Sequence, residues 1–105
     1  MSLDYDGIRL HWHGEWQRDG TTVVIWMKDA TYQRHLNARL VAVGLPTETY
    51  LQLLEKATTY HERQAAEEQL KRRYEVHEVL RRDLAYWESR ADPDVRRAIF
   101  PPPGR

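Results

Sequence analysis

Apolar and polar residues alternate along the first part of the chain, which is the pattern of half-buried β-strands. Two such runs flank Asp19-Gly20, a dipeptide that favours the type I′ turn because both central positions of that turn need a positive φ. We therefore expect an antiparallel β-hairpin over about residues 7–28. A turn at Asp19-Gly20 pairs four sets of residues: Arg18 with Thr21, Trp16 with Val23, Gly14 with Ile25, and Trp12 with Met27.

This register divides the hairpin side chains between two faces. The predicted core face is apolar and carries Ile8, Leu10, Trp12, Trp16, Val23, Ile25 and Met27. The opposite face carries Arg9, His11, His13, Glu15, Val24, Trp26 and Lys28. A tryptophan and two histidines thus share a face that folding alone would leave polar. That face is the first candidate for a functional surface.

After the hairpin the period lengthens to about 3.6 residues, which predicts helices. A helix over about 30–43 follows Asp29 as N-cap and ends at Gly44, with Pro46 beyond it. The β-branched Val41 and Val43 leave a strand over 36–43 as the alternative.

Two further helices are expected, over about 47–57 and 60–90. Thr47 is the expected N-cap of the first, and a break near Thr58 separates them because Thr59 and Glu62 match a capping box. One continuous helix is the alternative, since 47–90 contains no glycine or proline. In the long helix, Val79 and Tyr86 fall opposite the main apolar arc, which predicts a second contact.

These elements predict an α+β fold in which the hairpin packs on two or three helices. Asp92-Pro93 predicts a short C-terminal turn over 94–100, and a proline-rich flexible tail follows over 101–105. Residues 1–100 are expected to form one domain. A two-stranded hairpin has two open edges, so we also expect a homodimer.

Composition narrows the class of protein. The 105 residues carry 16 basic and 16 acidic groups, so the formal net charge is zero, and there is no cysteine. Thiol chemistry is therefore excluded. No apolar run is long enough to span a membrane and no signal peptide is evident, so a cytoplasmic location and no membrane partner are expected.

Few patterns in the chain suggest catalysis. His11 and His13 have a spacing that lets two imidazoles on one strand face reach a single metal ion. Two ligands are too few, so they form only a weak metal-binding pair. No phosphate-binding glycine loop or nucleophile motif occurs, and neither catalytic residues nor a cofactor are predicted.

The leading hypothesis is accordingly a small non-catalytic protein-interaction module, such as a regulator, inhibitor or adaptor. It would act through the hairpin face and the long helix. The candidate partner-binding residues are Arg9, His11, His13, Trp26, Val79 and Tyr86.

The alternative is a nucleic-acid-binding regulator that uses 30–43 and 47–57 as a helix-turn-helix-like unit. Its candidate contacts are Arg34, Arg39, Arg72 and Arg73. Zero net charge weighs against it, because phosphate neutralisation dominates such binding. A metal-dependent enzyme built on the histidine pair is the third hypothesis.

Overall fold

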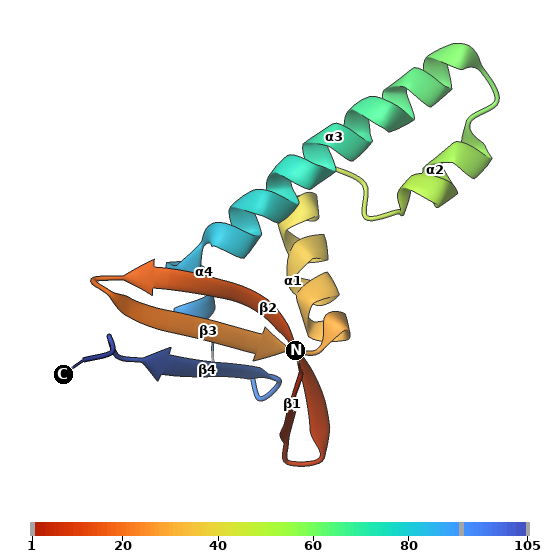
Figure 1. Ribbon diagram of the computed structural model, residues 1–105. Coiled ribbons are helices and arrows are strands. Elements are labelled where there is room, and N and C mark those ends of the chain that lie inside the picture. The colour runs from red at the N-terminus through yellow and green to blue at the C-terminus, as the bar shows by residue number, and fades with distance from the viewer. Residues whose placement is uncertain (1, 91, 105) are drawn as a thin grey trace. The chain divides into compact units, whose positions relative to one another are not determined.

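The protein has an α+β fold with a four-stranded antiparallel sheet and a long helix (Figure 1). This computed structural model describes residues 2–90 and 92–104. The elements in chain order are β1 (Ser2–Tyr5), β2 (Ile8–Arg18), β3 (Thr21–Met27), α1 (Asp29–Ala42), α2 (Tyr50–Lys56), α3 (Tyr60–Arg82), α4 (Leu84–Glu88) and β4 (Val95–Phe100). The expected class and the long helix are therefore confirmed, although the sheet contains more strands than predicted.

The strands follow the order β1-β2-β3-β4. The β1-β2 hairpin and the β2-β3 hairpin each turn at an Asp-Gly dipeptide. Asp19 and Gly20 have φ values of 52° and 77°, which confirms the predicted turn. Asp6 and Gly7 have φ values of 50° and 75° and join β1 to β2 in the same way. The Asp6-Gly7 signal was present in the sequence, and β1 alternates polar and apolar residues, but β1 has only four residues.

The predicted C-terminal turn over 94–100 is wrong, because Val95–Phe100 forms β4. A turn does occur just before it, where the Val95 amide donates to the Asp92 carbonyl at 3.0 Å. The chain then extends and pairs antiparallel with β3. Its partner strand is far away in the sequence, so a local pattern carries no information about this pairing.

A β-bulge at His13 changes the predicted hairpin register. The pairs Arg18/Thr21, Trp16/Val23 and Gly14/Ile25 are confirmed. Between Trp12 and Gly14 the register shifts, so Trp12 lies opposite Trp26, and His11 lies opposite Met27. One extra residue on a strand sends every earlier side chain to the other face of the sheet, so the predicted faces hold only from Gly14 onward.

Trp26 is consequently a core residue and is only 8% exposed. It forms a buried cluster with Leu10 and Val24, and partly buried side chains of β1, β2 and β4 pack against this cluster. Trp12, which was expected in the core, is 42% exposed.

The sheet is curled over the face that carries Trp26. The Arg96 guanidinium of β4 lies 3.6 Å from the ring centroid of Tyr5 on β1. Because β1 and β4 are the outermost strands, this cation–π contact joins the two ends of the sheet.

The other face of the sheet carries Trp16, as predicted, and lies against α4. The Trp16 indole N–H donates to the Arg82 carbonyl at 3.2 Å. Glu88 of α4 accepts from Arg18 of β2 at 2.8 Å and from Arg97 of β4 at 2.9 Å. One carboxylate therefore ties this short helix to two strands.

The chain divides into two compact units. The first comprises the described residues of 1–34 and 81–105, and the second is His35–Leu80. The first contains the sheet, the start of α1, and α4. The second contains the rest of α1, all of α2 and most of α3.

The helix over 36–43 is confirmed against the strand alternative, and α1 ends where the sequence predicts. Gly44 has a φ of 76°, and the Leu45 amide donates to the Leu40 carbonyl at 2.8 Å, as in a Schellman motif. The start differs by one residue. The Tyr32 amide donates to the Lys28 carbonyl at 3.0 Å, so Lys28 rather than Asp29 occupies the N-cap position.

The later helices begin and end at polar caps. Thr49, not Thr47, caps α2 in a capping box with Gln52. The break near Thr58 is confirmed, and Thr59 caps α3 by accepting from the Glu62 amide at 3.1 Å.

The helix predicted to continue to residue 90 ends at Arg82. Asp83 then caps α4 by accepting from the Tyr86 amide at 3.0 Å. Because the Asp83 carboxylate takes the Tyr86 amide, that amide is not available for the backbone hydrogen bond that would continue α3.

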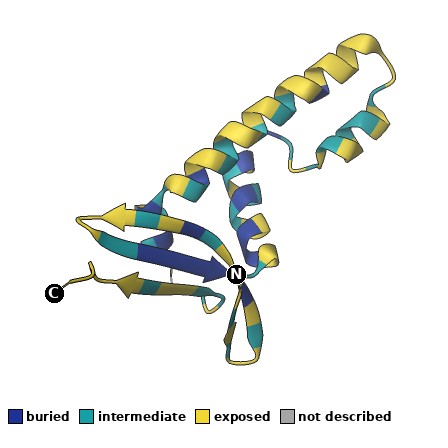
Figure 2. Ribbon diagram, in the orientation of Figure 1, coloured by how far each residue is buried: buried dark blue, intermediate teal, exposed yellow. Residues whose placement is uncertain are grey.

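Burial is unevenly distributed between the elements (Figure 2). Val23–Met27 of β3 are all buried, whereas α3 has only Ala66 and Leu80 buried and α2 has no buried residue. Across the described residues, no helix has the length and apolar character needed to cross a membrane.

Candidate interaction surface

The hairpin face predicted to bind a partner is not one surface in the structure. Trp26 is buried on the concave face of the curled sheet, and its indole N–H has no hydrogen-bond partner among the described residues. Arg9 is exposed and lies 3.4 Å from Asp4, and His11 is also exposed. His13, at the bulge, stacks on Tyr32 of α1 instead. Arg9, His11, His13 and Trp26 therefore do not form one patch.

His13 packs against the first turn of α1. Its ring stacks on Tyr32 at a centroid distance of 4.8 Å with an interplanar angle of 7°, and Tyr32 in turn lies 6.0 Å from Trp87. The Arg81 guanidinium donates to the His13 carbonyl at 3.3 Å. The bulged residue therefore fastens β2 to α1 and to the end of α3.

The environment of His13 favours the neutral imidazole. Burial lowers its pKa below the ordinary value of 6.5. The Asp29 carboxylate opposes this shift, whereas the charges of Arg81 and His11 add to it. His13 Nε2 and Asp29 Oδ1 are 3.5 Å apart, which is long for a hydrogen bond, so Asp29 acts mainly as a nearby charge.

A metal site at the histidine pair lacks the necessary ligands. Within residues 2–90 and 92–104, no three His, Cys, Asp or Glu side chains are grouped so that they could hold a metal ion. His11 is exposed, whereas His13 is stacked on Tyr32. Both stereochemistry and ligand number therefore argue against a zinc centre here.

The residues proposed for nucleic-acid binding have different surroundings. Arg34 lies 3.4 Å from Asp92 in the first unit. In the second unit, Arg72 is exposed and Arg39 is half-buried. Val43–Thr49 separates α1 from α2, which is longer than the roughly three- to four-residue turn of a helix-turn-helix.

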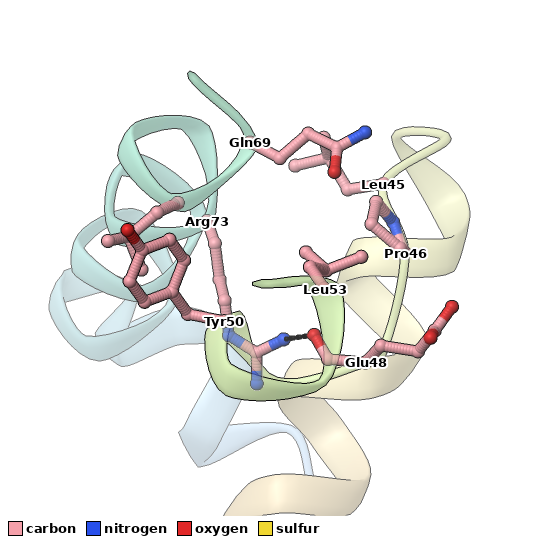
Figure 3. Close-up of a pocket in the computed structure, with 8 residues that line it drawn as sticks. Leu45, Pro46, Glu48, Tyr50, Leu53, Gln69 and Arg73 are labelled. Atoms are coloured by element: carbon pink, nitrogen blue, oxygen red, sulfur yellow. Dashed lines mark hydrogen bonds between the residues drawn. The ribbon is translucent and has the colours of Figure 1, made fainter. Parts of the chain in front are cut away.

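Arg73 supports the loop before α2. Its guanidinium donates to the carbonyls of Glu48 at 3.2 Å and Thr47 at 3.5 Å. Figure 3 shows this side chain beside a small hollow between α2 and α3, whose lining also includes Leu45, Pro46, Tyr50, Leu53, Gln69 and Leu70. One guanidinium nitrogen, Nη1, donates to two carbonyls of the loop, which gives Arg73 a structural role.

Val79 and Tyr86 belong to different helices and different units. Tyr86 is on α4, half-buried, with the Arg90 guanidinium 3.9 Å from its ring centroid. Val79 is on α3 and is 60% exposed. Of the partner-binding residues predicted from sequence, Val79 is the large apolar side chain that the structure leaves open to solvent.

Val79 is part of a continuous line on α3, which we call the outer stripe. Its members recur every three or four residues, so they share one side of the helix, and all are exposed. The outer stripe comprises Tyr60, Gln64, Glu68, Lys71, Glu75 and Val79. Tyr60 and Val79, at its two ends, are 71% and 60% exposed.

The sequence indicated the outer stripe only in part. Helical periodicity placed Val79 opposite the main apolar arc, but Tyr60 was read as the first residue after a cap. Comparison with protein-family models, curated proteins and solved structures gave no match.

Proposed function

We propose that the chain is a non-catalytic protein-interaction module that binds its partner through the outer stripe of α3. The observation that supports this proposal is the exposure of Tyr60 and Val79 on one side of a helix of 23 residues. Isolated exposed apolar residues are ordinary. Two of them on one side of one helix, with exposed polar residues between them, give a partner surface two apolar contacts and a polar strip to bind.

Charge favours a protein as the partner. The outer stripe contains two acidic residues, Glu68 and Glu75, and the basic Lys71. A nucleic acid or an anionic membrane would require a basic excess. A mixed-sign stripe between apolar anchors suits another protein surface with its own mixture of charges.

A photo-crosslinking experiment tests this function. A photoreactive phenylalanine analogue replaces Tyr60, in the full chain expressed in its native host. We expect adducts of discrete mass whose yield falls at least about tenfold when Val79→Asp is added, because a charge then faces the apolar contact. Arg63→Asp, at an exposed position of the same helix away from the stripe, is the matched control.

The captured protein must then bind the purified chain, and Val79→Asp must weaken that binding while the circular dichroism spectrum stays unchanged. An adduct that forms equally well with Val79→Asp contradicts the proposal. The absence of any discrete adduct also contradicts it.

A further inference from the structure

We infer that the partner of the outer stripe is a second copy of this chain, bound with the two α3 helices antiparallel. This inference rests on the proposed function and adds the identity and orientation of the partner. It comes from the distribution of charge along α3, which makes the stripe complementary to itself.

The charges in the middle of α3 are segregated by sign. Glu67 and Glu68 come first, and Lys71 and Arg72 follow. In the part of the chain that the structure describes, none of these four side chains forms an ion pair, although the i,i+4 spacing would allow it. The protein thus presents two acidic and two basic groups, side by side and uncompensated.

An antiparallel pair of helices compensates all four charges at once. With a two-fold axis at the level of Gln69 and Leu70, Glu68 of each copy faces Lys71 of the other. Glu67 and Arg72 flank the stripe on opposite sides, so Glu67 also lies near Lys71 of the second copy and Arg72 near its Glu68. A parallel pair would instead set acidic against acidic and basic against basic, which is unfavourable.

The same register also explains the two ends of the stripe. Tyr60 of one copy then faces Val79 of the other, and Gln64 faces Glu75. The apolar anchors therefore cover one another, and an amide lies beside a carboxylate that can accept its hydrogen bond. Every position of the stripe obtains a matching partner, as an isologous two-fold interface requires.

The outer stripe lies entirely within His35–Leu80, one of the two compact units. Zero net charge is also favourable, because two copies approach without overall repulsion. Exposed ion pairs contribute little each, so we expect a weak dimer that dissociates as salt rises.

Charge reversal tests the register directly. Glu67→Lys with Glu68→Lys makes the centre of the stripe entirely basic, and Lys71→Glu with Arg72→Glu makes it entirely acidic. Sedimentation is measured from about ten micromolar to about one millimolar chain. We expect each variant alone to associate at least about tenfold more weakly than the natural chain, and an equimolar mixture of the two to recover a dimer.

The mixture separates a failed interface from a failed fold. Unfolded variants would not recover association when mixed, and circular dichroism reports the helix content of each. The chain carrying all four substitutions restores the complementarity in reversed form, so it should dimerise again by itself. Failure of both the mixture and the fourfold variant, with helices intact, overturns the register.

Orientation is tested with single cysteines, since the natural chain has none. Gln64→Cys and Glu75→Cys should form a mixed disulfide under mild oxidation, because these positions face one another across the antiparallel pair. Two copies of Gln64→Cys should link poorly, since the substituted positions lie roughly 16 Å apart along the pair and a disulfide needs its Cα atoms within about 7 Å. Preferential linkage of Gln64→Cys to itself overturns the antiparallel arrangement.

The two proposals fail differently. A chain that is monomeric at every concentration overturns the second copy as partner. If photo-crosslinking at Tyr60 still captures a foreign protein in a Val79-dependent way, the interaction function stands with a different partner. If neither assembly nor capture depends on the stripe, both proposals fall.

Discussion

The indole ring of Trp16 lies over Gly14 so closely that a Cβ atom at position 14 would be 2.3 Å from Cη2 of the ring. Gly14 is therefore needed for a close approach, rather than for an unusual backbone angle. The ring in this position also donates its N–H to the Arg82 carbonyl. A glycine inside a strand and a tryptophan on the same face thus connect β2 to the end of α3.

Gly14→Ala should destabilise the protein by about 1–3 kcal/mol, because the Trp16 ring must move and give up its hydrogen bond. The measurement is chemical denaturation, with tryptophan fluorescence to report the ring environment. The control is the same substitution in a Trp16→Leu background. There, alanine should be neutral or stabilising, because glycine weakens strands. An equal cost in both backgrounds would exclude this explanation.

Trp26→Ala should lower the free energy of unfolding by about 3–5 kcal/mol, as expected for truncation of a buried aromatic side chain. Trp26→Phe should cost much less, because it also removes an indole N–H that has no acceptor among the described residues. Trp12→Ala, at a position that is 42% exposed, is the matched control. If Trp26→Ala and Trp12→Ala cost the same, Trp26 is not a core residue.

His13 should make the protein less stable in mild acid. The unfolded chain takes up a proton at this position near pH 6.5, whereas burial lowers the pKa in the folded state. The stabilising contribution is therefore fully present above pH 6.5, and it is lost as the pH falls toward the folded-state pKa.

The measurement is the change in melting temperature between about pH 7.5 and about pH 5.5. His13→Gln should reduce this change, because it removes the group whose pKa burial lowers. If the melting temperature of His13→Gln falls with pH as much as that of the natural chain, His13 is not the cause of the loss of stability in acid.

Arg73→Met should loosen the loop before α2, because it retains much of the aliphatic side chain but removes the donors to the Thr47 and Glu48 carbonyls. We expect a loss of about 1 kcal/mol and faster amide hydrogen exchange over residues 44–49. Arg63→Met, at an exposed position of the same helix, is the control. Unchanged exchange in this segment would contradict the structural role assigned to Arg73.

Much of the local structure could be predicted because its signals lie within a few residues of each other. Asp19-Gly20 determined a turn and three paired positions beyond it. Gly44 determined the end of α1, and Thr59 the start of α3. In each case a backbone angle or a side-chain cap is satisfied locally, without help from the rest of the fold.

The candidate site was only partly predictable. Helical periodicity alone places Val79 opposite the main apolar arc, and the structure adds that Val79 is exposed while Leu80, a member of that arc, is buried. The sequence also placed Trp26 beside His11 and His13, which was wrong because one extra residue at His13 changes the face of everything before it. Residues 23–27 of β3 are buried on both faces of the sheet, so their apolar pattern does not show which face each residue of β2 shares. The sequence therefore showed no sign of the extra residue at His13.

By itself, the sequence determined the Asp19-Gly20 turn, the end of α1 at Gly44, the cap of α3 at Thr59 and the class of the fold. The first three depend on contacts between near neighbours. Only the tertiary structure decided that Val95–Phe100 is a strand, because its hydrogen-bond partners are in β3. It likewise decided that Trp26 is buried, because burial depends on β1 and β4 curling over it until Arg96 meets Tyr5. Contacts between distant segments become favourable only when the whole sheet has assembled, and no local pattern encodes them.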